Sequence, residues 1–325
     1  MMEIHKIIYC EIDFLNALFE RLNRTYSPLD DDWEEGNCAR KILKDVMCQE
    51  CIIVHLDDKQ KFDKLFAENE YFRAMVKRME STKGYAKLDC DDFISLEAEN
   101  ASLNAMYFMT SGEELASKKG IFIITPKTLN NVLLYKDFGN GDIKRWKPLT
   151  WSVLLKNAKH NCNALIAVDN YLYKGRENNL FPIFDSLLPQ SLPKSVSFQI
   201  ALFMQEELGC SLERTHKQII DYLKEIRPEL SIDLTIYKCY TAEFHDRAII
   251  TNNMWIGCEG GLDLLKKDKY GLRTISTKTT KTHITYPFFH KDWSIDSYAL
   301  LLEDVENVRK VEREYIGSDQ NRLFD

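Results

Sequence analysis

The most chemically suggestive stretch of this 325-residue chain holds His245, Arg247 and the pair Gly260-Gly261. We expect a β-strand at the histidine, and residues two apart on a strand point to the same face. His245 and Arg247 would therefore project together. Glycine has no Cβ, so Gly260 and Gly261 would let backbone N–H groups come close to an anion. A histidine, a cation and exposed amides together favour binding of phosphate or chemistry on it.

A basic stretch follows shortly after the glycine pair. Lys278, Lys281 and His283 alternate with threonines there, as the residues of a strand would. They are near enough in sequence to share the same anion. A solvated edge strand protected by its lysines explains the pattern equally well, and both interpretations stay open.

The segment resembles the phospholipase D superfamily, whose motif runs His-x-Lys, then an Asp, then Gly-Ser-x-Asn. Arg247 takes the lysine position, and Asn252 or Asn253 takes the Asp position. With Asn253 there, the last part of the motif falls on Gly260-Gly261-Leu262-Asp263. The amino-acid sequence around His245 is most similar to the phospholipase D-like domain at the C-terminus of MIT-domain proteins. The resemblance covers residues 160–300.

That branch of the superfamily is regarded as a binding domain, so the resemblance implies a phosphate-binding site. Asp169 follows an expected strand at residues 164–168, in an Asp-x-Tyr pattern similar to the first strand of such domains. It would orient His245 or Arg247 from the neighbouring strand end. The implied ligand-binding residues are His245, Arg247, Asn253, Gly260, Gly261, Asp263, Lys278, Lys281 and Asp169.

The chain departs from the catalytic members of the superfamily in two ways. They use two His-x-Lys motifs, and this sequence has no second one. Arg247 keeps the charge of lysine and suits bidentate phosphate contact, but arginine is a poor proton donor. A homodimer could still bring two copies of His245 together. His245 could also be a half-buried strand histidine with no ligand.

Three functions follow, and the first is a protein that binds or senses a phosphate-bearing ligand. We place nucleic acid or nucleotide ahead of phospholipid, because the chain is acidic and shows no basic amphipathic helix. The alternative is a phosphodiesterase or nuclease, with His245 as nucleophile in a dimer or with a metal in the N-terminal half. Either enzyme would fit a bacterial defence protein. The third is a non-catalytic scaffold or phospholipid-binding module.

The N-terminal half alternates expected strands and helices, which predicts a mostly parallel α/β sheet with ligands beyond its carboxyl ends. Glu11, Asp13 and Asp57 stand at such ends and could hold Mg²⁺ or Mn²⁺ for phosphodiester hydrolysis. An Asp just after the first strand resembles PIN-type nucleases, although no Asp follows the later strand at residues 120–125. Helix capping by Asp13 and Asp58 needs no metal or other cofactor, and we favour it.

We expect two domains, residues 1–158 and 159–325. Expected helices include residues 59–78, 102–109, 179–188 and 211–227, and an Asn252-Asn253 turn joins two strands. The tail from Ile316 is expected to fray.

The composition and net charge of the chain limit the classes of function that it can have. Hydrophobic residues make up 45% and charged residues 29%, which is typical of a globular chain. The net charge of −7 argues against a general nucleic-acid coat but allows a local basic site. No apolar run is long enough for a transmembrane helix, and the N-terminus has no signal-peptide pattern. We therefore expect a cytoplasmic protein whose nine cysteines are reduced.

Overall fold

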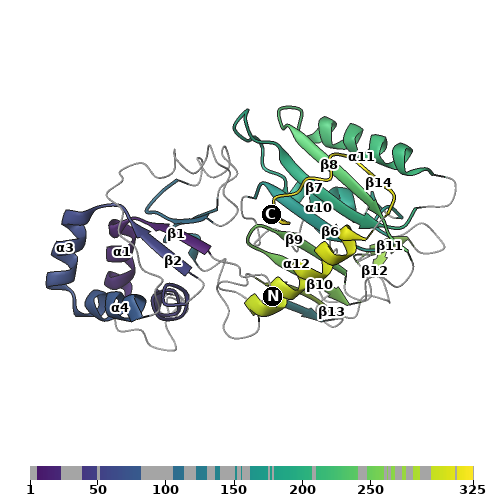
Figure 1. The fold of residues 1–325 in the computed structure, drawn as a ribbon. Coiled ribbons are helices and arrows are strands. Elements are labelled where there is room, and N and C mark those ends of the chain that lie inside the picture. The colour runs from purple at the N-terminus through teal and green to yellow at the C-terminus, as the bar shows by residue number, and fades with distance from the viewer. Residues whose placement is uncertain are drawn as a thin grey trace. The chain divides into compact units, whose positions relative to one another are not determined.

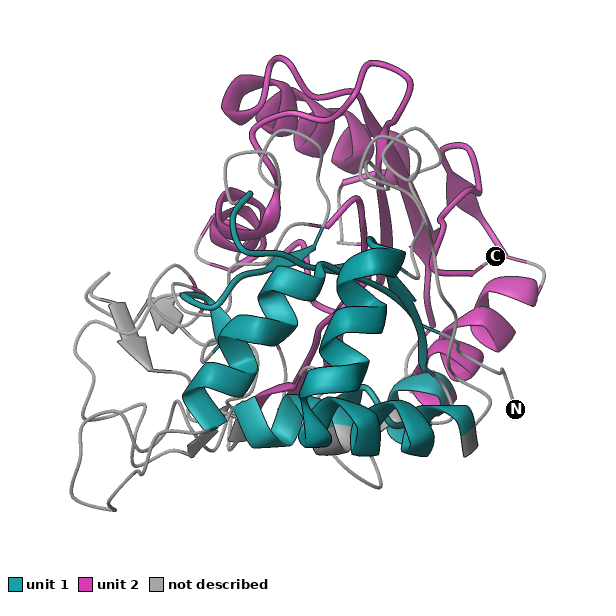
Figure 2. Ribbon diagram, turned by 90° about the vertical axis from the view of Figure 1, so that its left-hand side faces the viewer, with its two compact units in different colours: residues 1–134, 286–299 teal, residues 135–285, 300–325 magenta. Residues whose placement is uncertain are grey.

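The computed structural model divides the chain into two compact units, coloured teal and magenta in Figure 2. Unit 1 is Met1–Leu134 with Tyr286–Ala299, and unit 2 is Tyr135–Thr285 with Leu300–Asp325. Each unit contains strands and helices, so the expected two-domain α/β fold is confirmed. The residues described are 6–22, 39–49, 52–81, 105–112, 122–129, 136–139, 151, 155, 162–174, 176–177, 179–206, 210–240, 247–259, 262, 265–267, 273–275, 281–285, 294–311 and 313–324.

Unit 1 is built on sheet A, four parallel strands in the order β2-β1-β3-β4 (Figure 1). The parallel sheet predicted for the N-terminal half is therefore present. Its elements are β1 (Lys6–Cys10), α1 (Ile12–Leu22), η1 (Ile42–Val46), β2 (Ile52–Leu56), α3 (Lys59–Glu68), α4 (Glu70–Ser81), β3 (Ala105–Phe108) and β4 (Ile123–Ile124).

The helix expected at residues 102–109 is wrong, because β3 lies there between β1 and β4. All four of its residues are buried. A parallel strand covered on both faces is a continuous apolar run, and such a run cannot be told from a buried helix by its periodicity.

The single helix expected at residues 59–78 is two helices, α3 and α4, separated at Asn69. The Asn69 side chain accepts a hydrogen bond from Phe72 N at 3.0 Å and so caps α4. Asp58 caps α3 by accepting from Lys61 N at 2.9 Å, as the sequence predicts. Two caps only eleven residues apart define a short helix and then a new one.

Unit 2 is built on sheet B, eight strands in the order β14-β8-β7-β6-β9-β10-β13-β5. Strands β6, β7 and β8 are parallel, whereas β9 runs antiparallel to β6 and to β10. The elements are β5 (Lys136–Gly139), β6 (Ala164–Val168), α10 (Leu180–Leu187), β7 (Phe198–Met204), α11 (Leu212–Ile226), β8 (Ile232–Lys238), β9 (Arg247–Thr251), β10 (Trp255–Glu259), β11 (Leu265–Lys267), β12 (Arg273–Ile275), β13 (Lys281–Thr285) and β14 (Tyr315–Ile316). Helix α12 (Ser294–Lys310) crosses the division between the units.

The expected boundary at residue 158 does not coincide with the division between the units. Strand β5 precedes that residue, yet it pairs with β13 at the edge of sheet B. The last strand position of the sheet is thus filled from a distant part of the chain. Such pairing leaves no composition shift at the boundary, so the sequence gives no sign of it.

Helix α11 follows the sequence pattern closely and packs against β8. Ser211 caps its start by accepting from Arg214 N, and the apolar residues Ile219 and Leu223 are fully buried. The His216 Nε2 lies 3.0 Å from the carbonyl oxygen of Leu234. That histidine is therefore part of the packing between α11 and β8.

The fraying expected for the tail from Ile316 is wrong. Asn321, Leu323 and Phe324 are buried. Arg322 donates to the carbonyl oxygens of Asn163 at 3.0 Å and Ser197 at 2.8 Å, at the amino ends of β6 and β7. The tail is ordered because it satisfies backbone carbonyls of the sheet.

Helices in the described part of the chain are all too short or too polar to cross a bilayer. The described cysteines are all free thiols, as expected.

Candidate functional site

The carboxyl edge of sheet B, where β6, β7, β8 and β10 end and β9 begins, is the candidate site. Arg247 opens β9 opposite Cys258 of β10, and Val168 of β6 lies opposite Ala248. Continuing the β6–β9 register by one residue places Asp169 beside Arg247. Residues directly opposite on paired strands share a face, and their Cα atoms are about 5 Å apart. A buried carboxylate and an arginine are thus neighbours at this edge.

Asp169 binds two backbone N–H groups. Its Oδ1 accepts from Tyr171 N at 2.9 Å, and its Oδ2 accepts from Leu262 N at 2.7 Å. The Asp169 side chain is buried, and its own N–H continues the ladder to the carbonyl of Phe203. The described contacts of this carboxylate hold the chain in place. They do not include the orientation of His245 or Arg247 that the sequence suggested.

The contact with Leu262 fixes the segment that follows β10. The carbonyl of the same residue accepts from Trp151 Nε1 at 3.2 Å in a buried contact. Leu262 is therefore held on both its donor and its acceptor. Leu262, which directly follows Gly261 in the sequence, is thus held at the end of β6.

Asn170 offers a buried polar atom at the same edge. It is 7% exposed, and its Oδ1 has no hydrogen-bond partner among the described residues. Its backbone carbonyl accepts from Gln205 N at 3.1 Å, which fixes the residue at the ends of β6 and β7. A buried amide oxygen without a partner costs free energy, so a bound group that donates to it would be stabilised.

The charges along this edge divide into two parts. At the carboxyl ends of β7 and β8, Lys238 Nζ pairs with Glu206 at 2.6 Å and with Glu314 at 2.8 Å. The hydrogen bonds to Glu206 and then Glu314 raise the pKa of Lys238 above its usual range. That cation is matched by two carboxylates. Arg247 lies in the other part, where β6 and β10 end and β9 begins.

A second arginine lies in the segment after β6. The Arg176 guanidinium stacks over the ring of Tyr173, with 4.2 Å to the ring centre. The Tyr173 hydroxyl in turn donates to the side-chain oxygen of Gln218 in α11. Just before α11, the Sγ of Cys210 lies 3.4 Å from the Oγ1 of Thr215. These contacts tie the segment after β6 to the first half of α11.

Besides Asp169 and Arg247, two residues of the predicted ligand set are described, Lys281 and Asn253. Lys281 begins β13 opposite Glu259 of β10, so its backbone lies at the carboxyl edge. Asn253 lies at the opposite end of β9, about 20 Å along the strand from Arg247. Its assignment to this site is therefore wrong. His245, Gly260, Gly261, Asp263 and Lys278 lie outside the described residues.

The turn after β9 has a structural role instead. Asn252 Oδ1 accepts from Asn163 N at 3.2 Å and from Ala164 N at 3.1 Å, while its Nδ2 donates to Asn163 Oδ1 at 2.9 Å. Thr251 N donates to Met254 O, which closes the expected turn. An asparagine beside a strand end can thus bind backbone groups, just as it could bind a ligand.

The carboxylates at the carboxyl edge of sheet A bind other partners. Glu11 Oε2 accepts from the Thr110 N–H at 2.7 Å and hydroxyl at 2.8 Å, and Asp57 Oδ1 accepts from Ile12 N at 2.9 Å. Asp13 pairs with Lys61 at 2.8 Å. Burial raises the pKa of the Asp57 carboxyl.

The metal site suggested at Glu11, Asp13 and Asp57 does not form. Among the described residues, no three histidine, cysteine or acidic side chains gather as a metal ion requires. Asp13 instead pairs with Lys61, and Glu11 and Asp57 bind backbone groups. The sequence analysis missed Asn170 and Arg176; their positions just after an expected strand were the available signal.

No family model and no curated protein matches this chain. Among solved structures, it is similar to TrmBL2, an archaeal chromatin protein described as showing a novel mode of DNA binding. The identity is 13% and the TM-score 0.27, over 55% of this chain and 54% of that chain. The chain thus spans about half the length of that protein. A likeness at this TM-score supports no argument about fold or function.

Proposed function

We propose that unit 2 binds a phosphate-bearing ligand, a nucleic acid or a nucleotide, at the carboxyl edge of sheet B. The observation that carries the proposal is the register of β9. It brings Arg247 beside Asp169, whose carboxylate holds the backbone of Leu262 next to the glycine pair. The proposal places the glycine pair, which precedes Leu262 in the sequence, at this same edge.

Arg247 would contact the phosphate directly. A guanidinium presents planar donors that match two phosphate oxygens, and such charge-assisted bonds are stronger than neutral ones. Asp169 would act indirectly, by fixing the segment whose amides approach the anion. The buried Oδ1 of Asn170 could accept from a ligand hydroxyl or amino group, and nucleotides carry such donors on the sugar and the base.

The same residues support a proposed kinship with non-catalytic phospholipase D-like domains. In that proposal Arg247 stands where catalytic members have lysine, and one motif is left of two. Binding without turnover is the consequence. A nucleic acid or nucleotide is favoured over a lipid because the chain is acidic overall, which opposes docking on an anionic membrane.

Fluorescence anisotropy with labelled single- and double-stranded DNA and RNA tests the proposal. Arg247→Ala should weaken binding by about ten-fold or more, the effect of losing one charged hydrogen-bond donor. Lys194→Ala is the matched control, since this exposed lysine precedes β7 at the opposite edge of the sheet. It should change binding less than about two-fold. Circular dichroism and thermal unfolding establish that each variant is folded.

Unchanged binding in Arg247→Ala, or an equal loss in Lys194→Ala, would contradict the proposal. The same samples are analysed on a gel after incubation in EDTA and in Mn²⁺. Cleavage that survives EDTA and disappears in His245→Ala would establish a phosphodiesterase that uses His245. Cleavage only with Mn²⁺ would establish a metal-dependent nuclease and overturn binding without turnover.

A further inference from the structure

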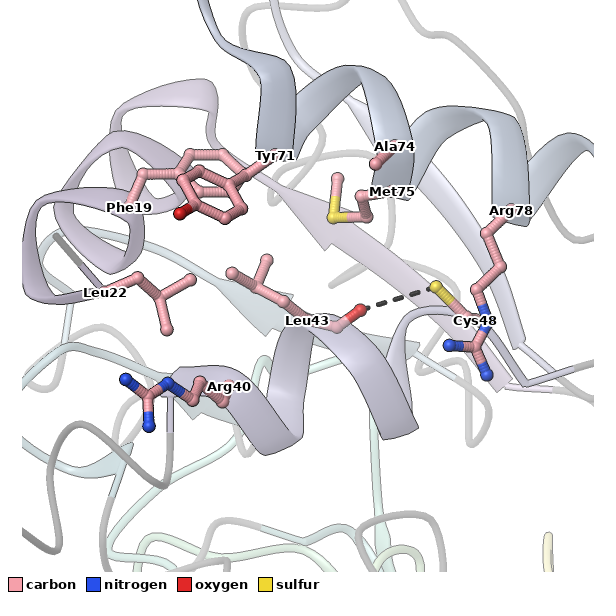
Figure 3. A pocket seen from close by; sticks show the side chains of 9 residues that line it. All are labelled: Phe19, Leu22, Arg40, Leu43, Cys48, Tyr71, Ala74, Met75 and Arg78. Carbon is pink, nitrogen blue, oxygen red and sulfur yellow. Dashed lines mark hydrogen bonds between the residues drawn. The ribbon is translucent and has the colours of Figure 1, made fainter.

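Unit 1 contains a cavity of about 420 Å³ between α1, η1 and α4, which the sheet edges described above do not involve. Figure 3 shows its lining. Phe19 of α1 and Tyr71 of α4 both belong to it, and Leu43 and Met75 point into the space between η1 and α4. The cavity is in the size range of small-molecule pockets in proteins.

Helix α4 has one side in the core and an adjacent stripe that lines the cavity, and the buried Met75 belongs to both. Phe72, Val76 and Met79 are almost wholly buried, as core residues at helical spacing are. Tyr71, Ala74, Met75 and Arg78 have spacings of three, one and three residues, so they form a second stripe, and this stripe lines the cavity. Tyr71 keeps 54% of its surface exposed. Part of the Tyr71 side chain is therefore accessible beside the cavity.

Cys48 and Leu43 make the floor of the cavity rigid. The thiol of Cys48 donates to the carbonyl of Leu43 at 3.4 Å, across the end of η1. Both side chains are buried. Leu43 of the π-helical turn thus lines the cavity, and its carbonyl accepts from the Cys48 thiol.

The charged residues in the described part of the lining are Arg40 and Arg78, and none of the described lining residues is acidic. Figure 3 shows Arg78 beside Cys48 and Arg40 on the side of Leu22. No hydrogen bond or ion pair joins the exposed Arg40 side chain to any described residue. Apolar walls with cations at the rim are complementary to a molecule that is apolar with an acidic end.

We propose that this cavity binds a small apolar acid, such as a medium-chain carboxylate. The hydrocarbon part would lie against Phe19, Leu43 and Met75, where each methylene removed from water contributes about 0.8 kcal/mol. The carboxylate would stay at the rim and pair with Arg40 or Arg78. The site is independent of the phosphate site proposed for unit 2.

Displacement of anilinonaphthalene sulfonate, a fluorescent apolar acid, tests the proposal on the full chain. Octanoate and octanol are the competitors, because they share a chain and differ in charge. Octanoate should displace the dye at a concentration about ten-fold lower than octanol. In the double variant Arg40→Gln, Arg78→Gln that preference should fall to about two-fold or less. Lys77→Gln, which removes one positive charge beside Arg78 but outside the described lining, should retain it.

Ala74→Phe completes the test by placing a ring in the cavity from an exposed position of α4. The dye and both competitors should then lose binding, while circular dichroism stays unchanged. The proposal is overturned if octanol competes as well as octanoate, if Lys77→Gln acts like the arginine variants, or if the dye binds Ala74→Phe unchanged. A wild-type protein that binds none of the three also overturns it.

Discussion

The carboxyl edges of the two sheets are built from similar residues and end up chemically different. At the edge of sheet A, Glu11 and Asp57 accept from nearby backbone groups, and Lys61 neutralises Asp13. At the edge of sheet B, Asp169 also binds backbone N–H groups, but an antiparallel strand places Arg247 beside it. The carboxylates act as structural ties at both edges. The inserted strand β9 distinguishes sheet B.

This difference shows how strand direction decides what an edge can bind. A wholly parallel sheet collects strand ends at one edge, and the residues there often cap the following helices. A strand running the other way begins at that edge, so it can place a cation among the ends. In unit 2 that cation is Arg247. The following predictions test whether the two edges differ as described.

The largest expected effect is that of Asp169→Ala on unit 2. The change leaves the buried Leu262 N–H without its acceptor and should lower the free energy of unfolding by about 3 kcal/mol. Asp57→Ala is the corresponding change in sheet A. It removes one hydrogen bond between a half-buried carboxylate and the backbone, so the free energy of unfolding should fall by about 1 kcal/mol. Hydrogen exchange in increasing urea, measured on peptides from β6 and β2, separates the units. Equal losses would remove the distinction between the two carboxylates.

A smaller effect concerns Lys6, a buried lysine in the middle of sheet A. Burial lowers the pKa of Lys6 to about 7. Between this value and the ordinary lysine pKa near 10.5, the unfolded state binds a proton that the folded state does not. The free energy of unfolding of unit 1 should therefore rise with pH, by about 1.5 kcal/mol from pH 7 to 8.5.

Urea unfolding at several pH values, with a hydrogen-exchange pulse at one fixed pH, measures the Lys6 effect on peptides from β1. Lys6→Met should abolish the rise and raise the stability of unit 1 at pH 7. Peptides from β7 should show no such rise in wild type. A wild-type unit 1 that is equally stable across this range would show that Lys6 stays charged in the folded protein.

The smallest expected effect is at the exposed pair of Asp13 and Lys61. About half of each side chain is exposed to solvent. Lys61→Gln should therefore cost less than about 0.5 kcal/mol, and this cost should vanish in high salt. Lys238→Gln in sheet B, which leaves two carboxylates close together, should cost more. Urea unfolding at low and high salt measures both, and a larger loss for Lys61 would reverse the order.

Local signals predicted the parts of the fold that depend on neighbours in sequence. Ser211 and the apolar stripe through Ile219 and Leu223 predict α11, and Asp58 caps α3 as its position suggests. The helix expected at 102–109 failed because burial on both faces removes periodicity. The tail was misjudged because its stability comes from carbonyls more than a hundred residues away, at Asn163 and Ser197.

The candidate site divides in the same way. The sequence by itself determined that Asp169 follows a buried strand, that Arg247 lies on another, and that the chain is α/β. Only the tertiary structure decided that these two residues are neighbours, that Asn253 is at the far end of β9, and that Asp13 pairs with Lys61. The physical reason is that residue types set local preferences, whereas strand order and direction arise from burying the whole sheet at once.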